Sequence, residues 1–402
     1  MNVLYFTLDD FDSLIQYRSI NTDLLREFMK HGHKVYVVSP SERRKNSASR
    51  VITEGDAVIF KPRIGNIQKT NIIEKGISTV TISSILVNGI REYLSDVRFD
   101  LILYCTPPIT FLKAVEYVKK RDNAATYLLL KDIFPQNAVD IGMMTTGGVK
   151  GLLYKHFRRQ EKKLYSISDR IGCMSQANVD YVLKHNPEID PRTVEVCPNS
   201  IEVEDKSVDQ ALKAAIRKKY GVPQDKTVFV YGGNLGKPQG IPFLVDCLGK
   251  LRDEKDAFFL IVGDGTEYAY LENAIGKAQQ DNVRLMKRLP KEDYDAMVGA
   301  CDVGMIFLDH RFTIPNFPSR MLSYMQAKIP ILACTDPNTD VGKTILEGDF
   351  GWWCESNDPD AAARLIRRIL REDRKAKGES GWNYLAEHYS VEKAYKTIVV
   401  NV

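Results

Sequence analysis

Residues 227–240 read Thr-Val-Phe-Val-Tyr-Gly-Gly-Asn-Leu-Gly-Lys-Pro-Gln-Gly, and an apolar helical pattern follows them. The stretch predicts a buried strand, a glycine-rich turn that carries one lysine, and the start of a helix. Gly232, Gly233 and Gly236 leave the backbone bare, so a ligand can approach its amides closely. A helix that starts there points free N–H groups and the positive end of its dipole at the turn. This combination suits a diphosphate, although the Gly-Lys-Ser/Thr ending of a P-loop is missing.

The size and composition of the chain narrow the classes of protein to which it can belong. Its 402 residues are too many for one ordinary core, so two domains are expected, and 44% hydrophobic with 27% charged residues is typical of a soluble globular protein. A net charge of +4 gives no reason to expect nucleic acid as a partner. Seven scattered cysteines without a Cys-x-x-Cys pair favour reduced, buried thiols in a cytosolic protein. Neither a signal peptide nor a membrane-spanning segment is expected.

Short apolar strands alternate with helical patterns along the first half of the chain. The predicted strands are 3–8, 34–39, 100–105, 126–130, 170–174 and 194–197. The predicted helices are 16–30, 72–94, 109–120, 151–165 and 177–184. Such alternation is typical of a parallel sheet wrapped by helices.

A polar, acidic stretch over 198–209 predicts a linker between two domains. Alternation resumes after it, with strands at 228–231, 258–262, 283–286, 303–307, 329–333 and 352–354 and late helices at 360–370 and 382–402. We therefore predict an N-terminal Rossmann-like domain over 1–200, a C-terminal Rossmann-like domain over 201–380, and a C-terminal helix over 381–402 that crosses back to the first domain. Two such units facing each other leave a deep cleft, where ligands bind at the carboxyl ends of the strands.

Two further loops in the second half also follow predicted strands. The first, Gly-Asp-Gly at 263–265, is either a tight connection or part of a ligand site. The second opens a helix with Pro318, Ser319 and Arg320, and is either a capped helix with a solvated arginine or an anion contact. For the loop at 318–320 we favour a second diphosphate contact, because this loop and the glycine-rich turn follow strands of one sheet and are expected to converge.

The ordered set of these segments resembles one family of enzymes. GGNLGKPQG, then VGDG, then FPSRMLSYMQAKIPILA are similar to segments of retaining family-4 glycosyltransferases of the two-domain GT-B type. In the first half, HGHKVYVV at 31–38 and CPNS at 197–200 resemble family segments, and LKDIFP at 130–135 resembles bacterial members that build O-antigen and capsule. The resemblance covers nearly the whole chain and implies an α/β GT-B fold, with two facing Rossmann-like domains and a deep interdomain cleft.

The resemblance also implies a function. A hexosyl or N-acetylhexosaminyl unit would pass from a nucleotide-sugar, with a UDP-linked donor expected, to a lipid-diphosphate-linked saccharide in cell-surface polysaccharide synthesis. Retention at the anomeric carbon is implied, and neither a metal nor a cofactor is expected, since the nucleotide-sugar is a substrate. The residues that this implies for donor binding are Gly233, Asn234, Leu235, Gly236, Gln239, Gly263, Asp264, Gly265, Pro318, Ser319 and Met321.

Four residues are predicted to be catalytic: Lys131, Asp132, Lys237 and Arg320. Lys237 and Arg320 are the cations left to stabilise the charge that grows on the leaving diphosphate. Asp132 ends a predicted buried strand, and two roles for it remain open. It either orients the acceptor hydroxyl, with Lys131 beside it, or only caps the next turn before Pro135.

The chain departs from the family pattern at several positions. Asn234 and Gln239 stand where the common loop carries an arginine and a lysine, and Lys131 stands where many members carry a histidine. The family's two glutamates would fall near Pro315 and Ser323, and both are missing. Their loss puts recognition of the ribose or donor sugar by a carboxylate in doubt. We interpret these departures as features of a subfamily.

A basic amphipathic helix is the second informative segment, in which Leu152, Leu153, Phe157 and Leu164 share one face. An ordinary surface helix packed on the sheet accounts for that face but not for the excess of cations. The cations are Lys150, Lys155, Arg158, Arg159, Lys162 and Lys163, joined by Arg43 and Arg44 of a second basic loop. The segment predicts attachment to an anionic membrane surface, hence a cytoplasmic protein on the inner face of the bacterial plasma membrane.

Two Asp-x-Asp strings, at 10–12 and 358–360, are interpreted as caps rather than metal ligands, and six dispersed histidines have no zinc spacing. Three other functions are open. A GT-B nucleotide-sugar 2-epimerase needs clustered acid–base residues that the sequence does not show. A non-catalytic nucleotide-sugar-binding partner of another transferase would explain the missing glutamates. A dinucleotide oxidoreductase is disfavoured because no glycine fingerprint follows the first strand.

Overall fold

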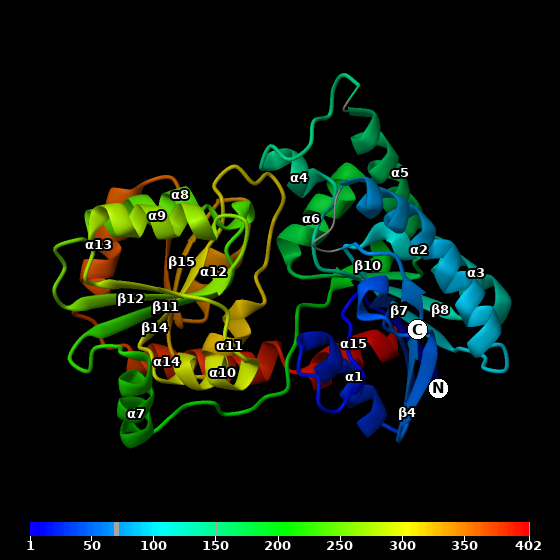
Figure 1. Ribbon diagram of the computed structural model, residues 1–402, viewed down its shortest axis with the longest axis horizontal. Coiled ribbons are helices and arrows are strands. Elements are labelled where there is room, and N and C mark those ends of the chain that lie inside the picture. Colours follow the sequence, from blue (N-terminus) through cyan, green and yellow to red (C-terminus); the bar gives the residue numbers. More distant parts are fainter. Residues whose placement is uncertain (68–71, 150, 402) are drawn as a thin grey trace. The chain divides into compact units, whose positions relative to one another are not determined.

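The computed structural model describes residues 1–67, 72–149 and 151–401 (Figure 1). The chain divides into two compact units. The first unit is Met1–Glu202 with Val391–Val402, and the second unit is Val203–Ser390. The sequence places the boundary at 200/201, two residues from the division in the structure. Among the described residues, none of the helices combines the length and apolar character needed to cross a bilayer.

The first unit is built on an eight-stranded sheet in the order β10-β9-β8-β7-β1-β2-β5-β4. All neighbours are parallel except β4, which pairs antiparallel with β5. Apolar runs fill the central strands because both faces of the sheet are covered. The strands are β1 Asn2–Phe6, β2 Lys34–Val38, β4 Arg50–Glu54, β5 Ala57–Lys61, β7 Leu101–Thr106, β8 Ala125–Leu130, β9 Arg170–Cys173 and β10 Val194–Val196, with a separate pair β3 Ser41–Glu42 and β6 Arg63–Ile64.

Seven α-helices accompany this sheet in the described part of the first unit. A capping box at Ser19 starts α1, because the Ser19 hydroxyl accepts the Thr22 amide. The C-terminal helix α15 packs against α1, and its Val391 amide donates to the Ile201 carbonyl over 3.1 Å. The helices are α1 Ile20–Lys30, α2 Ile72–Tyr93, α3 Leu112–Asp122, α4 Gln136–Asp140, α5 Gly151–Ile167, α6 Gln176–His185 and α15 Val391–Val400.

The second unit is built on a six-stranded parallel sheet in the order β13-β12-β11-β14-β15-β16. This is the strand order of a Rossmann-type domain, whose order reverses between its first and fourth strands. Here the reversal lies between β11 and β14, so their carboxyl ends mark the expected ligand position. The strands are β11 Thr227–Asn234, β12 Ala257–Asp264, β13 Val283–Met286, β14 Val303–Phe307, β15 Ile331–Thr335 and β16 Gly351–Glu355.

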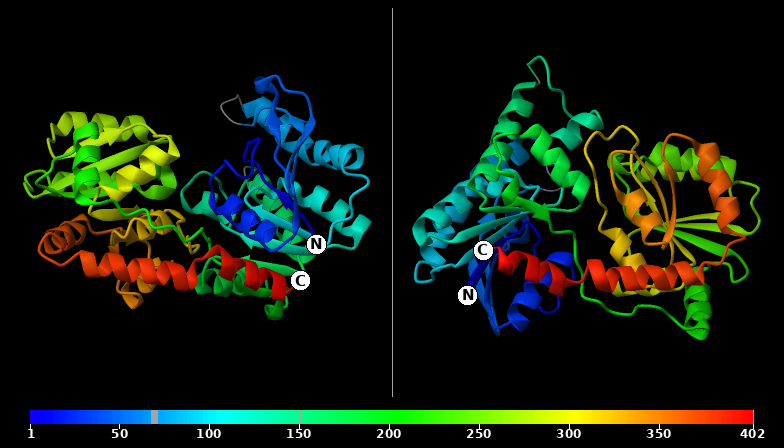
Figure 2. Two further views of the ribbon diagram at one scale, coloured as in Figure 1. Left: turned by 90° about the horizontal axis from the view of Figure 1, so that it is seen from below. Right: turned by 180° about the vertical axis from the view of Figure 1, so that it is seen from behind.

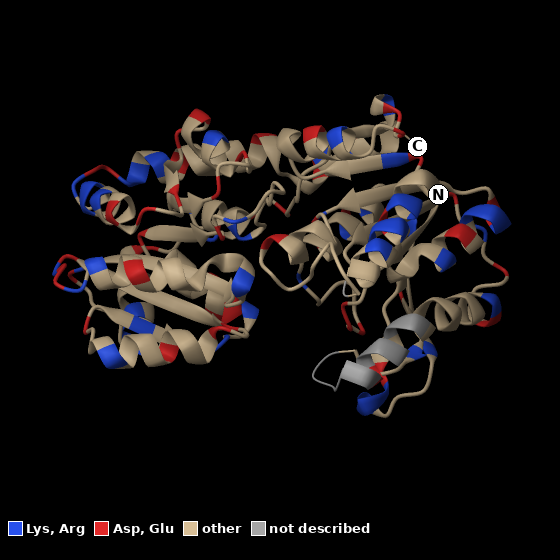
Figure 3. Cartoon of the chain, turned by 90° about the horizontal axis from the view of Figure 1, so that it is seen from above, with Lys and Arg blue, Asp and Glu red and all other residues tan. Residues whose placement is uncertain are grey.

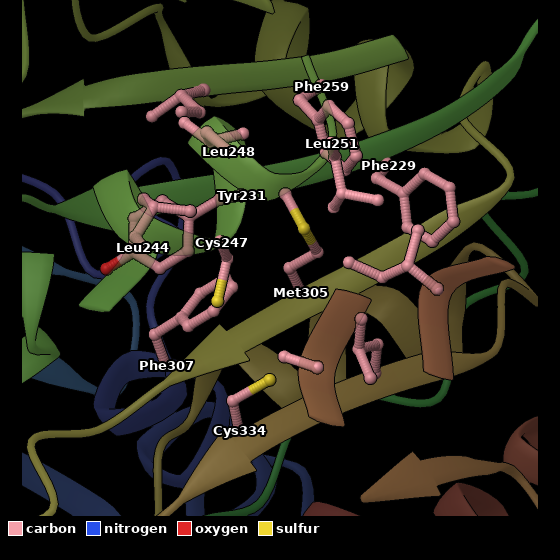
Figure 4. Packing of buried hydrophobic residues seen from close by; sticks show 14 of the residues in the cluster. Phe229, Tyr231, Leu244, Cys247, Leu248, Leu251, Phe259, Met305, Phe307 and Cys334 are labelled. Carbon is pink, nitrogen blue, oxygen red and sulfur yellow. The ribbon is translucent and has the colours of Figure 1, made fainter. Parts of the chain in front are cut away.

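Helices cover both faces of the second sheet (Figure 1). On one face, side chains of α8 such as Leu244, Cys247 and Leu248 pack against Phe229 and Tyr231 of β11 in a continuous apolar core (Figure 4). The same layer contains α9 and α13, and the opposite layer contains α10, α11 and α14. The helices are α7 Gln210–Tyr220, α8 Ile241–Lys250, α9 Tyr268–Ala278, α10 Lys291–Gly299, α11 Arg320–Gln326, α12 Val341–Glu347, α13 Pro359–Ile369 and α14 Lys375–His388.

The structure differs from the sequence-based prediction at the C-terminus and at one sheet edge. The helix predicted over 382–402 is two helices, α14 and α15, which end the chain in red in Figure 2. The break lies at Tyr389, whose backbone leaves the helical region. Strands β4 and β5 were not predicted. Strand β4 is a partly exposed edge strand and lacks the apolar run of a central strand. Strand β5 is fully buried, and its apolar run over 57–60 was an available signal.

Candidate functional site: a glycine-rich turn around a buried arginine

Three loops meet at the carboxyl edge of the second sheet. The Leu235 amide donates to the Asp264 carbonyl and the Glu267 amide donates to the Leu235 carbonyl, both over 2.9 Å. These bonds join the glycine-rich turn after β11 to the Gly-Asp-Gly loop after β12. From the start of α11, Arg320 reaches the same place, because a Cβ added at Gly233 would lie 3.4 Å from its Nη2. The three loops therefore converge, as the sequence predicts.

The glycines of these loops are required by close packing between backbones. Gly233 has a φ of +126°, a conformation open to glycine and strained for other residues. A Cβ at Gly263 would lie 2.0 Å from the Gly233 carbonyl oxygen, and a Cβ at Gly265 would lie 2.3 Å from the Leu235 carbonyl oxygen. The Gly-Asp-Gly loop is thus a tight connection that holds the glycine-rich turn in place.

Arg320 is the charged centre of this site. Its guanidinium carbon lies 4.4 Å from the centre of the Tyr231 ring, a cation–π contact. Its Nη1 is buried without a hydrogen-bond partner, and among the described residues Arg320 forms no ion pair with a carboxylate. A guanidinium stays charged in proteins. The site therefore holds a buried positive charge that the second unit itself does not neutralise.

Two tyrosines that the sequence analysis missed complete the surroundings of Arg320. The Tyr294 hydroxyl of α10 lies against Gly232, where an added Cβ would be 1.7 Å away. The Tyr324 hydroxyl donates to the Met305 carbonyl over 3.1 Å, and burial raises the pKa of Tyr324 to about 12. The spacing of Arg320 and Tyr324, four residues apart on one helix, was an available signal for this contact. Tyr294 carried no local signal.

The glycine-rich turn is closed by its own side chains. Gln239 Oε1 accepts the Gly236 amide over 3.2 Å and the Asn234 side-chain amide over 3.4 Å. A 3-10 turn, Lys237–Gln239, follows, and α8 begins only after Gly240, which has a φ of +55°. Helix α8 thus starts directly after the stretch 227–240, as the sequence predicts. Lys237 is exposed at this corner and remains available to a ligand.

Several residues that were predicted to bind the nucleotide-sugar donor have few groups that a ligand could contact. The side chains of Leu235 and Met321 are buried, and the Leu235 amide is already bonded to Asp264. Pro318 precedes α11 instead of lying in its first turn, and Ser319 is exposed but makes no capping bond. Their donor contacts stay predictions.

In the first unit, Lys131 and Asp132 follow β8. The Lys131 ammonium donates to Asn199 Oδ1 over 3.1 Å, and burial lowers the pKa of Lys131. The Asp132 carboxylate accepts the Ile133 amide over 2.8 Å and the Asn137 side-chain amide. Burial raises the pKa of Asp132 to about 6. The geometry supports the capping role directly, and the role toward an acceptor stays a prediction.

The cations of the basic loop at Arg43 and Arg44 have acidic partners. Arg43 pairs with Glu74 over 2.8 Å, and Arg44 pairs with Glu42 over 3.0 Å. Their charge is therefore largely balanced locally. Over both units, Lys and Arg are interspersed with Asp and Glu (Figure 3). A basic surface must accordingly be identified from unpaired cations rather than from composition.

Helix α5 retains such unpaired cations. Arg158 pairs with Glu161 over 2.7 Å and Lys162 pairs with Glu188 over 2.8 Å. Among the described residues, Lys155, Arg159 and Lys163 form no ion pair, and Lys150 lies outside the described residues. A pocket of about 530 Å³ follows this helix. Its lining residues are Tyr154, Lys155, Arg158, Arg159, Lys162, Lys163, Ser166 and Glu188.

The two Asp-x-Asp strings serve the fold in different ways. Asp358 caps α13 by accepting the Ala361 amide over 2.9 Å, so the cap interpretation is confirmed there. It was wrong for Asp10 and Asp12, because Asp10 bonds the buried Lys61 ammonium and Asp12 pairs with Arg50 over 3.0 Å. Within the described residues, no group of three or more His, Cys, Asp or Glu side chains is placed to hold a metal ion.

Comparisons with known proteins agree with this architecture. Residues 213–380 match the family model of glycosyl transferases group 1. The probable glycosyltransferase WbjE of Pseudomonas aeruginosa is 26% identical over 363 residues, which are 88% of this chain and 82% of WbjE. The putative colanic acid biosynthesis glycosyl transferase WcaI of Escherichia coli is 26% identical over 208 residues, 51% of this chain and 49% of WcaI.

A solved structure shows the same fold over the full length. The Anabaena protein HepE, crystallised with UDP and glucose, superposes with a TM-score of 0.72 at 12% identity and covers 100% of this chain and 98% of its own. The fold is therefore GT-B, built from two Rossmann-like units. The match to this family model lies within the second unit, and the matched range includes all three converging loops.

The contact between Gly263 and Gly233 predicts a large loss of stability on adding one methyl group. Gly263→Ala places its Cβ against a carbonyl oxygen that cannot move freely, and we expect a loss of about 1–3 kcal/mol in the free energy of unfolding. Gly276→Ala in α9 is the matched control, since nothing lies within 4 Å of its Cβ. It should gain up to about 1 kcal/mol. Thermal unfolding of both variants measures this, and equal midpoints would show the contact to be unimportant.

Burial of the Asp132 carboxylate predicts that the free energy of unfolding depends on pH. Its pKa is raised to about 6 in the folded chain, so the native state loses stability as pH rises through 6 and the group ionises. At pH 8, Asp132→Asn should therefore be more stable than the unchanged chain by about 1–2 kcal/mol in the free energy of unfolding. Thermal unfolding should show this as a higher midpoint. The difference should shrink toward pH 4.5. A difference that does not vary between these pH values would contradict the raised pKa.

Proposed function

We propose that this chain is a retaining, metal-independent glycosyltransferase. It moves a hexosyl or N-acetylhexosaminyl unit from a nucleotide-sugar, UDP-linked by preference, to a lipid-diphosphate-linked saccharide in cell-surface polysaccharide synthesis. The observation that carries the proposal is the buried, unneutralised guanidinium of Arg320 beside the glycine-rich turn. The group 1 match over the same residues, the printed function of WcaI, and the UDP bound to HepE support it.

The proposed sugar transfer mainly requires stabilisation of the negative charge that develops on the leaving group. When the bond to the sugar breaks, a nucleoside diphosphate leaves, and cations fixed in advance lower the energy of that step. Arg320 is fixed by the ring of Tyr231, and its Nη2, which lies beside the exposed Gly233, can donate to a phosphate oxygen. Lys237 is exposed at the corner of the same turn and can add a second charge. Because Arg320 is desolvated, its attraction for an anion exceeds that of a surface arginine.

The acceptor is assigned to the first unit. Asp132 and Lys131 stand at the carboxyl end of β8, where Asp132 can accept a hydrogen bond from an acceptor hydroxyl and fix its approach. Retaining transfer of this type can pass the hydroxyl proton to the leaving phosphate on the same face, so Asp132 need not be a full base. The unpaired cations of α5 suit the diphosphate of a lipid carrier and an anionic membrane surface, which would hold the protein at the inner face of the plasma membrane.

One alternative keeps a specific observation in its favour. Pro315 and Ser323 stand where the resemblance places two glutamates, as expected of a nucleotide-sugar-binding partner that lacks catalysis. Such a protein would bind the donor without turnover. An epimerase would instead convert the nucleotide-sugar without any acceptor, and the group 1 match does not favour it.

Mass spectrometry of reaction products distinguishes these functions. The purified chain is incubated with a panel of nucleotide-sugars, alone and with a prenyl-diphosphate-linked saccharide. We expect one sugar to be added to the acceptor, with unchanged yield in EDTA. Lys237→Ala should lower the rate by on the order of 10²-fold through the loss of one charge at the leaving group. Lys250→Ala, a surface lysine of the same unit paired with Asp360, should leave the rate unchanged.

Three results would count against the proposal. Conversion of the nucleotide-sugar alone would indicate an epimerase, and donor binding with no product on any acceptor of the panel would indicate a non-catalytic partner. Activity lost in EDTA and restored by Mg²⁺ or Mn²⁺ would overturn its metal independence.

A further inference from the structure

An exposed apolar cluster lies at the start of α5 and in the loop before it, which projects at the top of Figure 1. Met143 is 66% exposed, Val149 86%, Leu152 63% and Leu153 52%. We call these four residues the apolar tip. They lie within eleven positions of one another, whereas most large apolar side chains of the described chain are buried. An exposed apolar cluster of this kind indicates a surface that binds another molecule or a membrane.

The apolar tip is not among the residues through which α5 packs onto the first unit. Leu164 and Tyr165 are buried on the inner face of the helix, and Phe157 packs on Phe134 with ring centres 5.2 Å apart. Leu152 and Leu153, which the sequence places on one face with Phe157 and Leu164, take no part in this packing. Both leucines belong to the first turn of α5, which extends beyond the residues that anchor the helix.

Unpaired cations continue directly from the tip along α5. Leu152, Lys155, Arg159 and Lys163 follow one another at spacings of three, four and four residues, so they form one stripe on the helix surface. At a rise of about 1.5 Å per residue, the stripe is about 16 Å long. Its first position is apolar, and its other three line the α5 pocket without a carboxylate partner among the described residues. The acid at this pocket, Glu188, is held by Lys162.

We propose that the apolar tip inserts into the acyl-chain region of an anionic lipid bilayer, while Lys155, Arg159 and Lys163 bind the phosphate groups of its lipids. This inference rests on the proposed function in placing the protein at a membrane. It adds which side chains enter the bilayer and in what orientation α5 meets it. Along the stripe, the apolar residue lies at the start of α5 and the cations follow toward its C-terminal end. A bilayer has the same order from its acyl chains outward to its headgroups.

Charge complementarity favours a bilayer over a protein as the occupant. Three cations with no local acid attract any surface rich in phosphate, and their attraction is added to the apolar transfer of the tip. The two contributions respond differently to conditions, since salt weakens the first within a Debye length and leaves the second. A membrane-bound chain should thus be loosened but not fully released by salt.

Vesicle flotation tests the insertion. The full chain is mixed with vesicles of phosphatidylcholine, or of an equimolar mixture with phosphatidylglycerol, and we expect it to float with the anionic vesicles. Leu152→Asp combined with Leu153→Asp should lower the partition coefficient by at least about tenfold. Leu346→Asp is the matched control, because Leu346 is 56% exposed on α12 of the second unit. Reversal of Lys155, Arg159 and Lys163 to glutamate should abolish the preference for anionic vesicles.

A depth measurement separates insertion from contact with the surface. A nitrobenzoxadiazole label on Met143→Cys should brighten on binding and be quenched by lipids that carry a spin label on the acyl chain. The same label on Leu346→Cys should not change. Six of the seven native cysteines are buried, which limits unwanted labelling.

The outcomes separate this inference from the proposed function. If the unchanged chain and the leucine variant float equally, or if the label on Met143→Cys is not quenched, insertion of the tip is overturned while the transfer assay still stands. If the chain does not float and forms a dimer that Leu152→Asp dissociates, the tip is a protein interface and the inference is wrong. Sugar transfer to a detergent-soluble acceptor should be unchanged in the leucine variant, because donor and acceptor residues are intact.

Discussion

The second unit depends on a buried positive charge that it does not neutralise. Burying a guanidinium without a carboxylate costs free energy, which the face of Tyr231 offsets only in part. The cost is tolerated where an anion completes the site, as the diphosphate of a donor would. Arg320 thus links the stability of the unit to its proposed function, since the same charge that disfavours the empty site favours the occupied one.

The loops around Arg320 are fixed before any ligand arrives. Gly232 leaves room for the hydroxyl of Tyr294, and Gly263 leaves room for the carbonyl of Gly233. Gln239 satisfies the backbone of the turn and gives it a defined shape. Cations and backbone held in this way need little rearrangement as charge moves onto a leaving group, which is where such sites gain their catalytic effect. The absence of the two glutamates that the resemblance implies leaves these contacts untouched.

Much of this architecture follows from local sequence patterns, and the remainder depends on contacts distant in sequence. The parallel strands and the convergence at Arg320 were predicted, because apolar runs and strand-end glycines are local signals. Tyr294 was missed, since its contact with Gly232 joins positions 62 residues apart. The sequence also left open whether Leu152 packs on the sheet, because helical periodicity gives the face of a side chain and not whether the helix extends beyond the residues that anchor it.

Calorimetric titration with UDP tests the central claim most directly. Arg320→Ala should weaken UDP binding by about 10- to 100-fold, the effect of losing a hydrogen-bonded charge. Arg311→Ala is the control. Arg311 follows β14 at the same edge of the sheet, but it forms an ion pair with Asp309, to which its Nη2 donates over 2.7 Å. It should change the affinity less than about threefold. If Arg320→Ala remains folded and binds UDP and GDP as tightly as the unchanged chain, the buried guanidinium is not the diphosphate site.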